Sequence, residues 1–443
     1  MGMARCGERW RSEAAPERLG MGGMNKVARP QRRSREGSAL AAFRHRDFRL
    51  LWSGAFVSNV GTWIHNTALL WFVKEATGTN TWVGAVNLAN FLPLFLLVLW
   101  TGSLADRLDR RRLILATQTA MMLVALGLGL CLRAGLDSMG AVIPLTAAMG
   151  LAFVFNFPAW RAIIPDLVPP RDMLNGIALD AAQFNLARSV GPLLGALVLH
   201  LWGAETAFYI NAASFLAVIA ALLLIRTETP PSEETSATGS HILEVVRLVA
   251  GESWARNQLL LLAAFSFFGL SFLVLLPGLS RDVLMRGSRG YGALLSAIGA
   301  GAALGAPLVT VLRRHLPERD IIKASSLVFG LAMLGVAGCR LFWLCLVLSV
   351  ILGTSSLMMS ASINTVLQAR VGREMRGRVM SLYILVFQGL YPLGGMFLGF
   401  MSDHITIPWT LFLGGAVCTG AGLAVALVPS LLREAVSSVG GVS

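Results

Sequence analysis

The stretch Gly102-Ser-Leu-Ala-Asp-Arg-Leu-Asp-Arg-Arg-Arg112 decides the fold, because it is a short basic hinge between two apolar runs of membrane length. The run Trp82–Trp100 ends just before it, and the run Leu113–Leu132 starts just after it. Since a helix of about 20 apolar residues crosses a bilayer, the hinge must lie in water at one membrane surface. Arginines in a short loop mark the cytoplasmic surface, which we expect to be the side of this hinge.

The composition predicts a helical membrane protein with many spans. Of its 443 residues, 55% are hydrophobic and 14% are charged, whereas a soluble domain has about 25% charged residues. The length accommodates roughly a dozen spans of about 20 residues together with their connections.

The net charge of +13 follows the membrane topology and does not indicate a nucleic-acid partner. Six of the 37 Lys and Arg residues fall in the predicted outer loops and Arg188 falls within a span, which leaves 30 in the tails, in the inner loops or at the inner span ends. This asymmetry predicts that both termini are cytoplasmic. We therefore expect the bilayer to be a partner of the chain, in the inner membrane of a bacterium.

The chain lacks the common signatures of enzymes and metal sites. Its five cysteines have no metal-ligand spacing, and we expect packing residues with no disulfide, metal or cofactor. Gly-Lys-[Ser/Thr], His-Glu-x-x-His and Gly-x-Ser-x-Gly motifs are absent, so neither direct ATP drive nor hydrolysis has support in the sequence. These features predict a protein that is not an enzyme.

The apolar runs divide the chain into two halves. We expect a disordered basic cytoplasmic tail over 1–43, a six-helix bundle over 44–226, a cytoplasmic linker with an interfacial helix over 227–256, a second six-helix bundle over 257–430 and a tail over 431–443. The predicted fold is all-α, with twelve transmembrane helices in two pseudo-symmetric bundles. The predicted spans lie near 48–73, 82–104, 112–133, 139–164, 172–200, 205–226, 258–281, 290–312, 321–339, 342–369, 377–402 and 407–428.

An internal repeat supports the two halves. Asp172–Ile177 corresponds to Glu374–Val379, and Val190–Gly195 corresponds to Leu390–Gly395, at a spacing of about 200 residues. Two six-span halves related along the membrane normal are typical of transporters, whose substrate site lies between the halves near the bilayer midplane.

The hinge resembles the Gly-x-Leu-Ala-Asp-Arg-x-Gly-Arg-Arg signature of the major facilitator superfamily, with Asp109 in place of the second glycine. The stretches Asn185–Gly195 and Asn156–Trp160 resemble the branch that contains the enterobactin exporter and related secretion-type carriers. The resemblance covers about residues 43–430 and implies alternating access, usually with export driven by proton influx. It also implies a gating motif, for which we expect Gly102, Asp106, Arg107, Arg110, Arg111 and Arg161.

The sequence allows two interpretations of Arg161 in this motif. Either it pairs with Asp106 across the cytoplasmic face and holds a gate closed, or it extends its charge to the membrane interface.

Charged groups inside spans are the main candidates for function, because each costs roughly 2.5–3.5 kcal/mol at mid-membrane. Arg188 either binds an anionic group of the substrate or responds to protonation, or it stabilises the fold by pairing with a neighbouring span. Asp180 is a candidate proton carrier, eight residues earlier in the same span. His65 is a second candidate because histidine titrates between pH 5 and 8, although a lone histidine is more often a structural residue.

Further polar residues follow one stripe of the first span or recur in the second, fourth and eleventh spans. We expect these side chains to line a substrate cavity or to link helices: Asn59, Thr62, Asn66, Asn87, Asn90, Asn156, Gln388 and Tyr391, together with Arg188. Gly191, Pro192 and Gly195 predict a kink in the fifth span that either sets the direction of transport or serves packing alone.

Three functions remain open at this point. The first is a proton-coupled, monomeric exporter of small amphipathic molecules such as drugs or siderophores. The second is a carrier of similar fold that flips lipids or lysophospholipids, and the third is a sensor or scaffold that transports nothing. The hinge motif, the Gly-Pro motif and the intramembrane charges favour transport.

Overall fold

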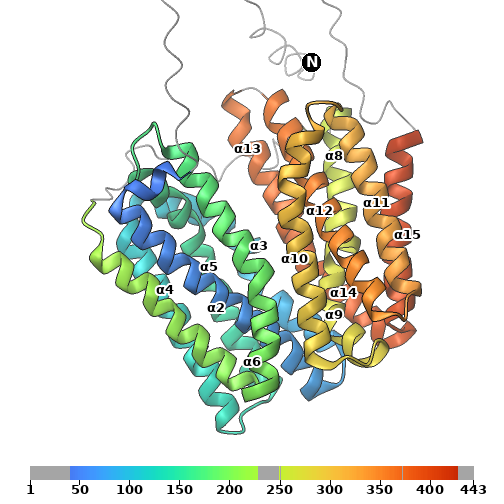
Figure 1. The fold of residues 1–443 in the computed structure, drawn as a ribbon, viewed down its shortest axis with the longest axis horizontal. Helices are drawn as coiled ribbons and strands as arrows, with labels where there is room; N and C mark the ends of the chain where they lie inside the picture. The colour runs from blue at the N-terminus through green and yellow to red at the C-terminus, as the bar shows by residue number, and fades with distance from the viewer. Residues whose placement is uncertain (1–39, 228–248, 250, 372, 428–443) are drawn as a thin grey trace, which may run out of the picture.

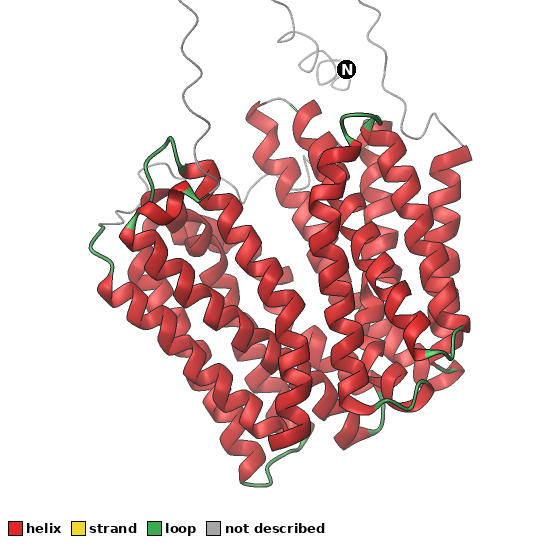
Figure 2. Ribbon diagram, viewed as in Figure 1, coloured by secondary structure: helices red, strands yellow, loops and turns green. Residues whose placement is uncertain are grey.

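The computed structural model describes residues 40–227, 249, 251–371 and 373–427, with the side chains of 98–107, 373–374 and 378 outside the description. Within these ranges the chain is helical and contains no strand (Figure 2). The expected tail before residue 40, most of the linker with its interfacial helix, and the tail over 431–443 lie outside the described residues. Both predicted bundles are described, apart from the hinge side chains and the few positions outside the ranges above.

The first bundle consists of long helices that follow the predicted spans closely. A short 3-10 helix, η1 (Ala41–Arg44), leads into them. The helices are α2 (Arg46–Thr77), α3 (Asn80–Arg107), α4 (Arg110–Arg133), α5 (Met139–Asp166) and α6 (Met173–Leu224).

The second bundle begins with an irregular span. It is built from α8 (Ser253–Ala264), η2 (Phe265–Gly269), η3 (Leu270–Leu275), α9 (Leu276–Gly278) and η4 (Leu279–Val283). The remaining elements are α10 (Gly287–Leu312), α11 (Glu318–Gly338), α12 (Phe342–Arg370), α13 (Arg373–Ile384), η5 (Leu385–Gly389), α14 (Leu390–Ile405) and α15 (Ile407–Leu427).

The twelve predicted spans are all present. Ten segments of the described chain are long and apolar enough to cross a membrane. One of these, α6, contains two helices that meet at Gly203, and α2 adds a further helix of 32 residues. The predicted all-α fold with two six-helix bundles is confirmed, and Figure 1 shows the bundles side by side.

The two halves share an unusual backbone position. Gly203 (φ 81°, ψ 175°) joins the fifth and sixth helices within α6. Thr406 (φ 81°, ψ 153°) joins α14 to α15, the eleventh and twelfth spans. The two residues occupy equivalent places in the halves, at the same repeat spacing as the sequence echoes. The connections therefore preserve the internal repeat even where the residue types differ.

One predicted connection is wrong. The outer loop expected over Lys74–Thr81 is only the turn at Gly78 and Thr79, because α2 continues to Thr77 and α3 begins at Asn80. Gly78 takes a left-handed conformation (φ 72°) and its amide closes the helix on the Lys74 carbonyl, a common helix ending. Lys74 is therefore a helical residue.

The hinge at the other end of α3 is also tight. Asp109 precedes α4 and accepts a hydrogen bond from the Arg112 amide at 3.1 Å, so it caps this helix. Arg110 forms an ion pair of 2.6 Å with Asp166 at the end of α5. We call the end of the molecule that carries this hinge the basic end, and the end that carries the turn at Gly78 the far end.

The bundles meet at the far end and diverge toward the basic end (Figure 1). Among the described residues, every hydrogen bond and ion pair between the bundles involves residues 74–87 of α2 and α3 on one side. Backbones also approach closely there, since a Cβ on Gly84 of α3 would lie 2.8 Å from the Gly395 carbonyl of α14. The structure is therefore closed between the bundles at the far end.

Candidate functional site

Arg188 lies on α6 where the two bundles meet, halfway between Met173 and Gly203. Its backbone carbonyl faces Gly299 of α10, where a Cβ would approach to 2.7 Å. Only a glycine allows α10 to lie this close, so the sequence of the second bundle places the Arg188 backbone against it. The guanidinium is thus held in the membrane interior beside the seam between bundles.

Arg188, Tyr391 and Asn87 form a polar cluster across this seam. The Arg188 guanidinium is close enough to Tyr391 for an electrostatic interaction. The Tyr391 hydroxyl donates to the Asn87 Oδ1 atom at 3.2 Å, and its ring meets Phe91 edge-on at 5.4 Å. The sequence named the three polar residues as separate candidates, and the structure brings them together from α6, α14 and α3.

The backbone around Tyr391 is irregular and is held by serines. The π-helical turn η5 interrupts the helix just before it, and such turns leave carbonyls without helical partners. Ser266 donates to the Phe387 carbonyl at 2.6 Å, and Ser271 donates to the Tyr391 carbonyl at 2.7 Å. These two buried serines, which the sequence reading did not single out, fix the height of Tyr391 in the membrane.

In the described part of the chain, the cluster contains donor groups but no carboxylate. Among the described residues, no carboxylate lies within 4.0 Å of the Arg188 guanidinium, because none of the ion pairs involves it. Asn87 is 4% exposed, and its Nδ2 atom has no partner in this part of the chain. A cation and an amide donor in one seam can together recognise an anionic group.

A second polar network lies within the first bundle, closer to the basic end. Asp180 accepts hydrogen bonds from Trp160 Nε1 at 3.3 Å and from Gln183 Nε2 at 3.1 Å. Asn59 donates to Gln183 Oε1 at 3.0 Å. Gln183 is buried and connects two residues that the sequence proposed separately; its position one turn after Asp180 was the available signal.

Two further polar candidates on α2, His65 and Thr62, contact residues of the first bundle. His65 is buried, its ring packs at 4.7 Å from that of Phe208, and its Nδ1 atom has no described partner. Thr62 donates to Asn211 at 3.5 Å. Asn66 is partly buried on the same helix. These contacts favour a structural role for His65 over proton coupling.

The remaining amide candidates are buried or partly buried. Asn156 is buried and accepts from Thr117 at 3.0 Å, which joins α5 to α4. The Asn90 carbonyl on α3 packs against Gly150 of α5. Gln388 is partly buried in η5, one turn before Tyr391. Gln388 lies one turn from Tyr391 and Asn90 lies one turn from Asn87, so both are close to the polar cluster along their helices.

The Gly-Pro motif of α6 packs against helices of both bundles. Gly191 packs on the Trp63 side chain, and a Cβ on Gly195 would lie 3.0 Å from the Ile64 Cα atom, so both glycines admit α2. The Pro192 carbonyl faces the opposite bundle, where a Cβ on Gly292 of α10 would approach to 2.8 Å. The motif therefore lets α6 contact both bundles closely.

The hinge motif is described in part. Gly102, Asp106 and Arg107 belong to the last turns of α3, with side chains outside the description. Arg111 donates to the Leu223 carbonyl at 3.3 Å, and the Arg161 guanidinium lies 5.5 Å from the centre of the Phe157 ring. The pairing of Asp106 with Arg161 stays a prediction.

Metal chemistry has no visible site in the described part of the chain, where no three His, Cys, Asp or Glu side chains gather in a metal-binding group. The polar groups at the seam are amides, hydroxyls and one guanidinium. Such groups bind and orient a solute by hydrogen bonds and charge.

Comparisons with known proteins agree with this architecture. A family model described as transmembrane secretion effector matches residues 37–438. The staphyloferrin A transporter of Staphylococcus aureus is 26% identical over 370 residues, which are 82% of this chain and 91% of that protein. The multidrug efflux pump Tap of Mycolicibacterium fortuitum is 26% identical over 367 residues, which are 80% of this chain and 88% of the pump.

A solved structure with the same fold is that of the nucleoside transporter NupG. It covers 88% of this chain and 100% of its own, with a TM-score of 0.70 and 14% sequence identity, so the likeness concerns the fold alone. The family match spans nearly the whole chain, including both bundles and the hinge. The chain is therefore a membrane transporter, not an enzyme, and belongs to the transmembrane secretion effector family of the major facilitator superfamily.

Proposed function

We propose that this protein is a proton-coupled exporter of small amphipathic molecules that carry an anionic group, of the siderophore or drug type. It acts as a monomer in a bacterial inner membrane, with both termini and the basic end in the cytoplasm. The names of its relatives support a drug or siderophore substrate. The arginines of the hinge support the orientation.

The proposal rests on Arg188, which forms no ion pair with a carboxylate among the described residues. A cation within a membrane span is costly when no carboxylate pairs with it, and its usual explanation is function. Arg188 lies beside Tyr391 at the seam that alternating access must open and close. In the proposed cycle the guanidinium binds the anionic group of the substrate, and the aromatic ring of Phe91 supplies apolar contact nearby.

Asp180 is the proposed proton carrier. Its described partners, Trp160 and Gln183, are neutral hydrogen-bond donors. Protonation would weaken both hydrogen bonds and release the link through Gln183 to Asn59 on α2. Proton entry from outside would thereby change the contacts of α6, the helix that carries Arg188.

The test begins with metabolite profiling of cells with and without the protein, to find an exported compound. Export of this compound, of its uncharged ester and of a cationic analogue is then measured in everted vesicles for Arg188→Ala, Arg188→Lys and the exposed-loop control Arg340→Ala. We expect Arg188→Ala to reduce export of the anion at least about tenfold, as the loss of one charged contact does. The ester should be affected much less.

Two results would contradict the proposal. Equal losses for the anion, the ester and the cation would show that Arg188 does not contact the anionic group. Transport of fluorescent lysophospholipid instead of soluble compounds would favour the lipid carrier, and the absence of any flux in reconstituted vesicles would favour the scaffold.

A further inference from the structure

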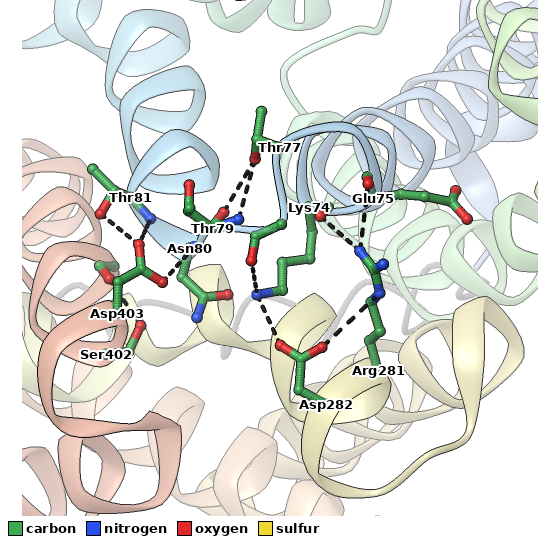
Figure 3. A network of polar contacts seen from close by, with 12 residues as sticks. Lys74, Glu75, Thr77, Thr79, Asn80, Thr81, Arg281, Asp282, Ser402 and Asp403 are labelled. Atoms are coloured by element: carbon green, nitrogen blue, oxygen red, sulfur yellow. Dashed lines mark hydrogen bonds and ion pairs between the residues drawn. The ribbon is translucent and has the colours of Figure 1, made fainter.

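The turn between α2 and α3 is held by charges of the second bundle. Figure 3 shows two carboxylates and a guanidinium of that bundle around this turn. Arg281 Nη1 donates to the Lys74 carbonyl at 2.8 Å, at the carboxyl end of α2. Asp403 accepts from the Asn80 and Thr81 amides at 2.8 Å each, at the amino end of α3.

The signs of these charges match the helix ends. The carboxyl end of a helix carries a partial negative charge and the amino end a partial positive charge. Arg281 therefore meets the end of α2 that attracts a cation, and Asp403 meets the end of α3 that attracts an anion. Asp403 acts as an N-cap supplied by another helix, and it also accepts from the Thr81 hydroxyl at 2.6 Å.

Lys74 adds an ion pair beneath the turn. Its ammonium lies 2.8 Å from Asp282 Oδ2 and donates to the Gly78 carbonyl at 2.8 Å. The Lys74 side chain is 3% exposed, whereas that of Asp282 is 43% exposed. A buried ammonium requires its partners, so separating the bundles here must either hydrate Lys74 or give it another acceptor.

Glycines make the surrounding seam tight. A Cβ on Gly399 of α14 would lie 2.5 Å from the Asn80 carbonyl, and Gly278 of α9 also packs against Asn80. The two helices α3 and α14 therefore touch through their backbones next to the charges. The charges and the close backbones lie in the same part of the seam, so separating the bundles here would break both sets of contacts together.

We propose that Lys74, Asn80 and Thr81 of the first bundle, with Arg281, Asp282 and Asp403 of the second, form the outer gate of the transporter. We call these six residues the clasp. The clasp keeps the far end closed while the basic end is accessible, and it must separate for release of substrate to the outside. Its role in release rests on the proposed export function, whereas the closure itself rests on the contacts above.

The gate is tested with spin labels on cysteines, in a chain whose native cysteines are replaced by serine. One pair, Leu136→Cys and Met285→Cys, spans the far end at exposed positions of the two bundles. A second pair, Leu174→Cys and Leu316→Cys, spans the basic end. Distances within each pair are measured by double electron–electron resonance in lipid nanodiscs.

Three variants are compared in both labelled backgrounds. Asp403→Ala removes the cap, and the double variant Lys74→Met with Asp282→Leu removes the ion pair without leaving a buried charge. Asp137→Ala is the matched control, because it removes an exposed carboxylate at the same end of the molecule.

We expect both clasp variants to lengthen the far-end distance and shorten the basic-end distance, with at least about a tenfold change in the ratio of the two states. The control should resemble the parent protein. Unchanged distances in both clasp variants would overturn the gate, whatever the transport activity. Shifted distances with undiminished export would leave the gate standing and contradict the proposed cycle.

Discussion

Charged residues within the bundles differ here in what surrounds them, and this difference guides which of them we propose for function. Arg188 has no described carboxylate nearby, and Asp180 has only neutral donors. Lys74 has two described partners, the Gly78 carbonyl and the Asp282 carboxylate, and the second of these links the bundles. Lys74 is buried whereas Arg188 and Asp180 are partly exposed, so exposure and partners together distinguish the three.

Replacement of Asp180 by Asn should uncouple transport from the proton gradient. Asn keeps an oxygen that accepts from Trp160 and Gln183 but cannot take up a proton between pH 5 and 8. We expect transport driven by a pH gradient to fall at least about tenfold while substrate-driven exchange is retained. Both are measured in proteoliposomes, with Asp137→Asn as the control; full gradient-driven transport in the variant would contradict the assignment.

Asp47 provides a pH-dependent contribution to stability outside the membrane. Burial raises the pKa of its carboxyl, whereas hydrogen bonds from the Thr227 hydroxyl and the Arg226 and Thr227 amides lower it, and the net pKa lies below the ordinary value of 3.8. A carboxyl whose pKa is lowered by folding contributes its full stabilisation of the folded state at pH values above its unfolded pKa. This contribution is lost as the pH falls through the folded pKa.

Thermal unfolding of Asp47→Asn in detergent should therefore show a lower Tm than the parent at pH 7. The Tm difference should remain constant down to about pH 5 and disappear below the folded pKa, where the parent is protonated too. A difference that persists unchanged at pH 3 would mean that the charge of Asp47 contributes nothing to stability.

Helices and their joints follow the twofold repeat of the chain. Gly203 and Thr406 share a backbone region that is essentially restricted to glycine, yet only the first half has glycine there. The shared conformation reflects the geometry needed to turn the fifth span of each half into the sixth. Thr406 adopts this conformation with local backbone strain. The conformation is held because the Thr406 amide donates to the Ser402 carbonyl and so closes α14.

Substitutions at these two joints should change the free energy of unfolding in opposite directions. Gly203→Ala should destabilise by about 1–3 kcal/mol, the usual cost of a side chain in this backbone region. Thr406→Gly should stabilise by about 1 kcal/mol, because relief of strain exceeds the added unfolded-state entropy of glycine. Thermal unfolding checks both, with Gly140→Ala as a helical control that has free space; a stabilised Gly203→Ala would contradict the shared-joint argument.

The whole molecule consists of two bundles, and every described hydrogen bond and ion pair between them involves residues 74–87 of the first bundle. Charges close the seam between α3 and α14, and backbone proximity closes the seam between α6 and α10. Glycines occur at both seams and let the backbones approach, but side chains also cross the interface. Trp71 of α2 packs in the core of the second bundle and stacks on Tyr291, and Val274 packs in the core of the first bundle. Separation of the bundles as two rigid bodies must therefore part these side-chain contacts as well.

Gly292→Ala should open the far end without a change in charge. The added methyl group would collide with Ala196 and lie 2.8 Å from the Pro192 carbonyl, both across the interface. We expect a longer far-end distance between the labels at 136 and 285 and reduced export. Gly127→Ala, whose Cβ would meet only Leu145 at 3.7 Å within the first bundle, is the control. An unaltered distance in Gly292→Ala would show that the α6–α10 seam does not limit closure.

Much of the molecule could be predicted because membrane spans are local features. Twenty apolar residues form a helix in a bilayer whatever their neighbours, so the span ends agree with the helices to within a few residues. The sequence also marked Arg188, Asp180 and Tyr391, because ionisable or polar groups inside spans are rare. It missed Gln183 and the serines at 266 and 271, since small or uncharged polar residues are common in helices that merely pack.

By itself, the sequence determined the class of protein, the number and limits of its spans, its internal repeat and its basic end. Tertiary structure alone decided which polar groups meet: that Arg188 lies beside Tyr391, that His65 faces Phe208, and that Lys74 is buried beneath a carboxylate from more than 200 positions away. The physical reason is that hydropathy and periodicity act along one segment. The partner of a buried charge depends on how whole bundles are rotated and brought together.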